Sequence, residues 1–143
     1  MELEGEYDDS NVFAKILRGE IPSAKVWEDD RAVVIMDAFP QAPGHCLVVP
    51  KVPARNLMDA PPEMLAHLVA VTQTTAKACA RALSCDGIRI MQFNGSAAGQ
   101  TVFHLHFHVI PIQAGKALDK HAAGQADPGE LAELAGKIGA EMA

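Results

Sequence analysis

The chain has 143 residues, of which 49% are hydrophobic and 21% charged, and its formal net charge is −6. This length supports one domain with its own core, and the apolar runs fall far short of the ~18–20 residues that a membrane span needs. A long nucleic-acid surface needs clustered Lys and Arg, and the sequence has no basic run. We therefore expect neither a nucleic-acid nor a membrane partner.

The first residues are acidic and polar, and they lack the basic and apolar regions of a secretory signal. We expect residues 1–9 to form a flexible acidic tail and residues 10–143 to form a single domain, because no repeat or linker interrupts them. Cys46, Cys79 and Cys85 are odd in number and lack Cys-x-x-Cys spacing, which is typical of thiols in a reducing compartment. A cytoplasmic location is expected.

In the first part of the chain, apolar spacing predicts a short helix over residues 12–18, ended by Gly19 and Pro22. A hairpin turns at Asp29-Asp30, and a further strand ends at Pro50. The three strands predicted here cover residues 24–28, 31–37 and 45–49.

The second part begins with a long amphipathic helix over residues 61–83, whose first turn contains two prolines. Strands over residues 87–94 and 103–110 follow. A last helix begins at Asp127-Pro128-Gly129-Glu130, where an acceptor, a proline and an acid occupy the first positions. These elements predict an α+β domain with a five-stranded antiparallel sheet, one long helix, a short N-terminal helix and a C-terminal helix.

Three histidines, His104, His106 and His108, alternate with apolar residues on the last predicted strand. Because strand side chains alternate between faces, we expect the imidazoles to share one face and Phe103, Leu105, Phe107 and Val109 to bury the other. Histidine is suited to proton transfer, phosphoryl attack and metal binding near neutral pH. This pattern therefore indicates a functional site, whereas the isolated His67 and His121 are expected to be structural.

Three further features converge on this strand. The loop over residues 94–101 is small and polar, so its backbone amides are expected to cradle a phosphate or an oxyanion. His45, at the start of a strand, is expected to lie behind the cluster and orient one imidazole. Asp37 lies at the end of another strand, and two roles are expected for its carboxylate: it accepts from ribose hydroxyls or it caps a turn.

Residues 104–110 follow the pattern His-φ-His-φ-His-φ-φ, where φ is apolar, which resembles the signature of the histidine triad (HIT) superfamily. The resemblance covers about residues 10–112 and is strongest for the Hint-like branch, which includes bacterial HIT proteins; it implies a HIT-like fold. The other matching blocks are residues 12–16, 19–22, 28–30, 37, 40–45, 47–51, 94 and 99–101.

The resemblance implies a homodimeric hydrolase or transferase that cleaves at the α-phosphate of purine nucleotides without a cofactor or metal. His106 would attack phosphorus and form a nucleotidyl-histidine, with the carbonyl of His104 holding its other nitrogen. His104 and His45 would support the site, and His108 would donate to a phosphate oxygen. The implied phosphate contacts are Asn94, Gly99, Gln100, Thr101 and His108. The implied nucleoside contacts are Val12, Phe13, Ile16, Ile35, Asp37 and Ala38.

Two departures from the family matter. Many bacterial relatives carry a zinc-binding Cys-x-x-Cys pair where this chain has Asn11 and Ala14, so we expect no zinc. The chain also lacks the Trp-Pro-Pro-Gly ending of many Hint proteins, which affects the choice of leaving group. The leading hypothesis is a purine nucleoside phosphoramidate hydrolase. The alternatives are a dinucleoside polyphosphate hydrolase and a non-catalytic nucleotide- or metal-binding module.

Overall fold

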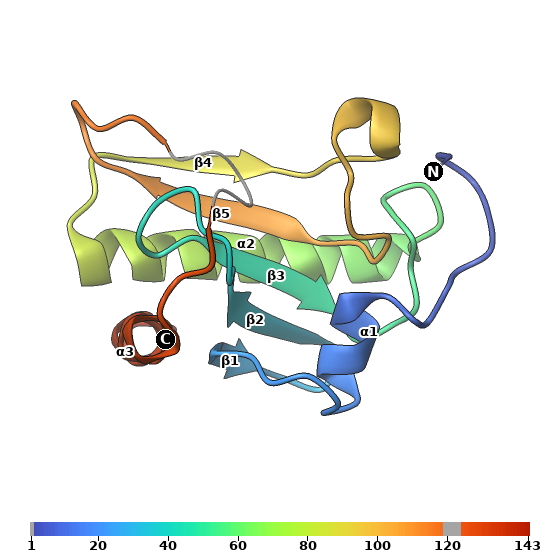
Figure 1. The fold of residues 1–143 in the computed structure, drawn as a ribbon, viewed down its shortest axis with the longest axis horizontal. Helices are drawn as coiled ribbons and strands as arrows, with labels where there is room; N and C mark the ends of the chain where they lie inside the picture. Colours follow the sequence, from blue (N-terminus) through green and yellow to red (C-terminus); the bar gives the residue numbers. More distant parts are fainter. Residues whose placement is uncertain (1, 119–123) are drawn as a thin grey trace.

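The computed structural model of the chain describes residues 2–118 and 124–143 and contains one five-stranded antiparallel sheet in the order β1-β2-β3-β5-β4 (Figure 1). His121 lies outside the described residues. The predicted α+β architecture is confirmed. The strands are β1 (Lys25–Glu28), β2 (Ala32–Met36), β3 (Cys46–Pro50), β4 (Gly87–Met91) and β5 (Phe107–Ile112).

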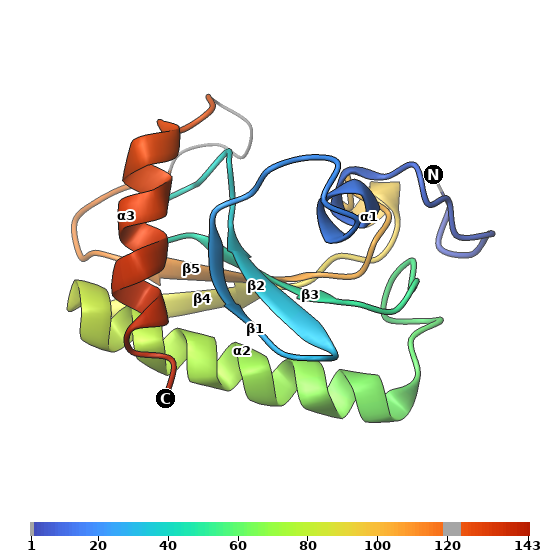
Figure 2. The ribbon, with the colours of Figure 1, turned by 90° about the horizontal axis from the view of Figure 1, so that it is seen from below.

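The helices cover both faces of the sheet. The long helix α2 (Pro62–Leu83) runs along one face, and the short helix α1 (Val12–Leu17) lies on the other (Figure 2). The C-terminal helix α3 (Pro128–Gly139) packs against α2 and β1, and the Asp127 side chain accepts from the amide of Glu130, as the sequence predicts. No helix in the described part of the chain is long and apolar enough to span a membrane.

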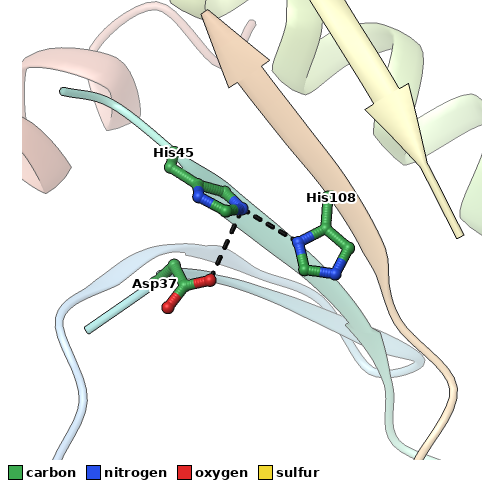
Figure 3. Close-up of side chains that lie close together, drawn as sticks. All are labelled: Asp37, His45 and His108. Atoms are coloured by element: carbon green, nitrogen blue, oxygen red, sulfur yellow. Dashed lines mark hydrogen bonds and ion pairs between the residues drawn. The ribbon is translucent and has the colours of Figure 1, made fainter. Parts of the chain in front are cut away.

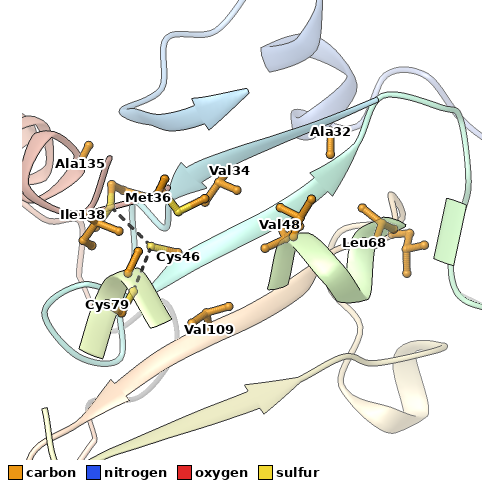
Figure 4. Packing of buried hydrophobic residues seen from close by; sticks show 14 of the residues in the cluster. Ala32, Val34, Met36, Cys46, Val48, Leu68, Cys79, Val109, Ala135 and Ile138 are labelled. Atoms are coloured by element: carbon orange, nitrogen blue, oxygen red, sulfur yellow. Dashed lines mark hydrogen bonds between the residues drawn. The ribbon is translucent and has the colours of Figure 1, made fainter. Parts of the chain in front are cut away.

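The central strands β2 and β3 are buried along their whole length, so they divide the core into two layers. Val34, Val48 and Val109 pack with Leu68 of α2 in the larger layer (Figure 4). Each fully buried side chain of this size stabilises the fold by about 1.5–3 kcal/mol. The smaller layer lies under α1 and contains Phe13, Val33, Ile35, Leu47 and Val49.

The cysteines are thiols, as predicted. Cys46 and Cys79 are buried in the larger layer with their sulfurs 4.0 Å apart, and Cys85 is partly buried (Figure 4). The two buried thiols pack as small apolar side chains between β3 and α2.

The histidine strand is shorter than predicted. Strand β5 begins at Phe107, and His104 and Leu105 lie in the irregular segment before it. The amide of Leu105 donates to the carbonyl of Ala54 rather than to a neighbouring strand, and the carbonyl of His104 accepts from a side chain. These two bonds replace the ladder, so the prediction of a strand from residue 103 is wrong. Strand β4 likewise ends at Met91 rather than at residue 94.

The acidic N-terminal segment runs beside the loop that follows β3 and beside the turn Ser96–Ala98 (Figures 1 and 2). Its backbone carbonyls at Glu2 and Leu3 accept from the side chains of Arg55 and Asn56. Nothing in the composition of the segment indicated these contacts. That residues 1–9 are flexible stays a prediction.

Two glycines of α3 allow a matched test of how this helix is held. A Cβ at Gly139 would lie 2.7 Å from the carbonyl oxygen of Val26, whereas a Cβ at Gly136 would meet nothing within 4 Å. We expect Gly139→Ala to lower the free energy of unfolding by about 1–3 kcal/mol, because it forces α3 away from β1. Gly136→Ala should instead raise it by about 0.5–1 kcal/mol through helix propensity.

Urea unfolding of the two variants beside the unaltered protein measures both changes. Equal effects at the two positions would contradict the close approach of α3 to β1.

Candidate active site

The histidines gather on the face of the sheet that carries α1. His108 of β5 pairs with Leu47 of β3, and Leu47 belongs to the smaller layer on this face. His45 immediately precedes β3 and reaches His108. The predicted split of the run is confirmed for Leu105 and Val109, which are buried in the opposite layer. Phe103 departs from it, because the guanidinium of Arg55 lies over its ring, 4.8 Å from the centroid.

His106 is the most exposed imidazole of the three. Its ring lies between Phe13, 4.8 Å away centroid to centroid, and His108, 5.0 Å away. Its Nδ1 atom lies 2.7 Å from the carbonyl oxygen of His104. A carbonyl only accepts, so Nδ1 carries the proton and Nε2 of the neutral ring carries a lone pair. The predicted contact between His106 and the His104 carbonyl is confirmed.

His104 is buried and held at both ring nitrogens. Its Nε2 atom lies 2.8 Å from the carbonyl oxygen of Pro50, so Nε2 carries the proton. Its Nδ1 atom lies 2.5 Å from the hydroxyl of Tyr7. Burial lowers the pKa of His104, although the bond to Pro50 opposes the shift. His104 is therefore a neutral ring at neutral pH.

Asp37, His45 and His108 form a second chain of contacts (Figure 3). The amide of Gln41 donates to Nδ1 of His45, so the neutral His45 ring carries its proton on Nε2. That atom lies 2.9 Å from Nδ1 of His108 and 3.4 Å from Oδ2 of Asp37. With Nδ1 of His108 accepting, its proton sits on Nε2. The expectation that His45 lies behind the cluster and orients an imidazole is confirmed for His108.

Comparisons with known proteins agree with this geometry. The HIT domain family model matches residues 18–115. A HIT-like protein from Bartonella henselae, solved with an unknown ligand, superposes with a TM-score of 0.92 at 47% identity, covering 96% of this chain and 99% of that one. The chain belongs to the HIT family.

Two curated HIT relatives have named activities. The adenylylsulfatase HINT3 of Arabidopsis thaliana is 36% identical over 78% of this chain, which spans only 59% of the plant protein's length. The adenosine 5'-monophosphoramidase HNT1 of Saccharomyces cerevisiae is 37% identical over 78% of this chain and 68% of its own length.

The pairing of β2 with β3 brings a carboxylate to the histidines. Antiparallel pairing of Met36 with Cys46 places Asp37 beside His45. Ligand atoms of Asp37, His45 and His108 lie within 4.8 Å of one another. However, the imidazole nitrogens are 2.9 Å apart, whereas nitrogens on one tetrahedral zinc sit about 3.3 Å apart. The set fits a hydrogen-bonded network better than a cation, and the expectation that no metal takes part stays a prediction.

The predicted phosphate loop is braced internally. The backbone amides of Gly95, Ala98, Gly99 and Gln100 all donate to oxygen atoms within the loop. That the loop cradles a phosphate stays a prediction. The Gln100 side chain is buried and bonds Gly95 and the carbonyls of Arg55 and Val102.

The other predicted phosphate contacts differ in their surroundings. The side-chain carboxamide of Asn94 bonds the Gln92 side chain and accepts from the backbone amide of Leu57. Gly99 and Thr101 are exposed. Of the proposed set, Thr101 is exposed, whereas Gln100 and His108 are buried. Contacts of this set with phosphate stay predictions.

The predicted nucleoside residues lie along α1 and the end of β2. Phe13 and Ile35 are buried in the smaller layer, Ile16 packs against it, and Val12 is 38% exposed. Asp37 is buried and its Oδ1 accepts from the amide of Phe39. The carboxylate therefore caps a turn, which is one of the two roles expected for it. Ala38 is partly exposed, and Phe39 beside it is 40% exposed. Contact of these six residues with a nucleoside stays a prediction.

Two aromatic neighbours of the histidines were not predicted from the sequence. Tyr7 bonds His104, and the Phe93 ring lies edge-on to His108 at 5.5 Å. Tyr7 sits in the acidic segment, whose composition indicated a loose tail. Phe93 lies just beyond β4, where the predicted alternation carried no sign of its contact.

One hollow of the structure lies away from the triad. A cavity of about 390 Å³ is lined by Gln41, Pro43, Leu83, Pro111 and Lys116 among others, and no triad histidine lines it. The titratable cluster and the partial exposure of His106, rather than cavity size, identify the candidate site.

The burial of neutral His104 predicts a pH-dependent stability. Its pKa in the fold lies below the ordinary value of 6.5, so the stabilisation is present above that pH and is lost as pH falls through the folded-state pKa. His104→Gln removes the titrating ring. The difference in unfolding free energy between the two proteins should shrink by up to about 1.4 kcal/mol per pH unit in that window.

Urea unfolding at pH 7.5, 6.5 and 5.5 measures this difference. A difference that stays constant across the three pH values would show that His104 does not titrate on unfolding.

Proposed function

We propose that the protein is a HIT-type hydrolase that cleaves purine nucleoside phosphoramidates at the α-phosphate through a nucleotidyl-His106 intermediate. One observation carries the proposal: the partly exposed His106 ring has its Nδ1 proton held by the His104 carbonyl at 2.7 Å. The lone pair needed for attack on phosphorus is therefore on Nε2 in the neutral ring.

The first step forms the bond from Nε2 of His106 to phosphorus and breaks the bond from phosphorus to the amine, which takes a proton from solvent as it leaves. The ring becomes cationic, and the His104 carbonyl stabilises it by accepting from Nδ1. Water then attacks the phosphorus and loses a proton to solvent, the bond to Nε2 breaks and returns its electron pair to the ring, and the nucleotide leaves. Splitting the displacement in this way replaces one difficult step with two easier ones.

His108 supplies a fixed donor in this scheme. The contacts from Gln41 to His45 and from His45 to His108 leave the His108 proton on Nε2. A hydrogen-bond donor that is already fixed at this atom does not have to reorganise during the reaction. It therefore stabilises the charge that develops on the phosphate oxygens. Asp37 lies beside Nε2 of His45 and would stabilise that ring if it became protonated.

The nucleophile is tested by His106→Asn, with His67→Gln as the matched control. His67 is a histidine of α2 that pairs with Asp29 outside the cluster. We expect His106→Asn to lower kcat on adenosine 5'-phosphoramidate by about 10³-fold or more, because no lone pair at that position can attack. AMP should still bind, and His67→Gln should keep near-normal turnover.

The covalent step is tested separately by rapid quenching. The unaltered protein should release amine in a burst that matches the enzyme concentration when breakdown of the intermediate limits turnover. Near-normal rates in His106→Asn would overturn the covalent scheme. Tight AMP binding with no product from any nucleotide would instead support the non-catalytic nucleotide-binding module.

The leaving group separates the enzyme alternatives. The yeast relative is named a phosphoramidase and the plant relative an adenylylsulfatase, and both names describe reactions at an adenylyl group. The test is to measure kcat/KM for adenosine 5'-phosphoramidate, adenylyl sulfate and a diadenosine polyphosphate. The highest value on the polyphosphate would favour the dinucleoside polyphosphate hydrolase, and the highest value on adenylyl sulfate would favour sulfate as the leaving group.

We also propose that the protein acts as a homodimer. Strand β4 lies at the edge of the sheet, and Ile90 on it is 45% exposed. Val69 on α2 is 57% exposed. An edge strand with an exposed apolar residue favours pairing with another chain.

The dimer is tested by sedimentation velocity at micromolar concentration, which should give a dimer for the unaltered protein. Ile90→Lys should shift the protein toward monomer. A single monomeric species for the unaltered protein would rule the dimer out.

A further inference from the structure

The N-terminal segment is held to the domain by a buried cation. Arg55 is 4% exposed, and its guanidinium donates to the backbone carbonyl of Glu2 at 2.8 Å and of Glu6 at 3.4 Å. Asn56, also buried, donates to the carbonyl of Leu3 at 2.8 Å. A buried guanidinium is costly unless its donors are satisfied. The segment supplies those acceptors, so its position is coupled to the interior of the domain.

This anchoring places Tyr7 against the first triad histidine. The Tyr7 hydroxyl oxygen accepts from Nδ2 of Asn11 at 2.9 Å and lies 2.5 Å from Nδ1 of His104. Nε2 of His104 already donates to the carbonyl of Pro50. Nδ1 of the neutral ring therefore accepts, and the hydroxyl proton of Tyr7 points to it. Burial raises the pKa of Tyr7, which keeps the phenol protonated at neutral pH.

The His104 ring and the His104 carbonyl belong to one residue in an irregular segment. Because β5 begins only at Phe107, no strand ladder fixes the carbonyl that holds His106. The backbone bond from Leu105 to Ala54 and the two bonds on the His104 ring do so instead. The ring is also packed edge-on against Phe13.

We propose that Tyr7 is a positioning residue of the triad: its hydroxyl clamps the His104 ring, and thereby fixes the His104 carbonyl that keeps Nε2 of His106 aimed for attack. The inference rests on the proposed function only for its kinetic consequence. The clamp itself is a statement about the tautomer of His104 and the Nδ1 proton of His106, which exist without a substrate.

The kinetic test is Tyr7→Phe, which keeps the ring and removes the hydroxyl. Nδ1 of the buried His104 then loses its donor, and the ring is held at one end only. We expect kcat on adenosine 5'-phosphoramidate to fall about tenfold while KM changes by less than about twofold, because orientation of the nucleophile matters most in the transition state. Glu4→Gln is the matched control, since Glu4 is an exposed acid of the same segment, and it should leave both constants unchanged.

The spectroscopic test uses two-bond ¹H–¹⁵N correlation spectra of the histidine rings. In the unaltered protein, His104 should show its proton on Nε2, and His106 should show a slowly exchanging proton on Nδ1. Tyr7→Phe should shift the Nδ1 resonance of His104, which loses its hydrogen-bond donor, and should speed exchange of the His106 proton, whereas Glu4→Gln should give the original spectrum. A role in stability alone would lower the melting temperature of Tyr7→Phe without changing the ring spectra of the folded protein.

Three results would overturn the proposal: kcat within about twofold of the original, unchanged ring spectra in folded Tyr7→Phe, or a Tyr7→Phe protein that does not fold. A different result separates the two proposals. If the unaltered protein hydrolyses none of the nucleotides but Tyr7→Phe still changes the His104 and His106 spectra, the clamp holds and the proposed function fails.

Discussion

The hydrogen bond from Nδ1 of His106 to the carbonyl of His104 is the contact on which the site depends. An imidazole that attacks must present a lone pair, and only a fixed acceptor at the other nitrogen selects that tautomer. A carbonyl engaged in a sheet ladder would be directed at a neighbouring strand. The chain leaves the ladder before Phe107, so this carbonyl turns back to the side chain two residues later. The proposed chemistry thus requires this local loss of regular structure.

The surrounding network gives the ring nitrogens of the imidazoles complementary hydrogen-bond partners. His104 is neutral through burial, and its two ring nitrogens have complementary partners. Nδ1 of His45 accepts a hydrogen bond from the amide of Gln41, and Nε2 of His45 donates to Nδ1 of His108. Among the described residues, no buried side-chain nitrogen or oxygen lacks a hydrogen-bond partner. A satisfied polar network of this kind is rigid, which preserves the orientation that the proposed attack on phosphorus needs.

Sequence patterns predicted the elements because each has a local cause. The Asp127 cap, the prolines of α2 and the apolar runs of β2 and β3 act within a few residues, and the helices and strands follow. The proximity of Asp37 to His45 also has a local cause. Strands β2 and β3 pair as antiparallel neighbours, which brings the end of β2 beside the start of β3. The partner of the His104 carbonyl was not predictable in this way. The amide of the next residue, Leu105, bonds the carbonyl of Ala54, which lies far away in sequence, and this keeps the segment out of the sheet ladder.

The N-terminal segment shows why composition alone is a weak guide to order. Its glutamates suggest a solvated tail, yet the contacts that place it use backbone carbonyls, which every residue has, and not the acidic side chains. The determinants of that placement are Arg55 and Asn56, more than 40 residues away, and they are buried. A buried guanidinium must find acceptors, and it cannot be read from sequence which stretch of chain will supply them. Here the stretch carries Tyr7, so satisfying a cation in one loop also places a hydroxyl at the first histidine of the triad, and structural order is coupled to the site.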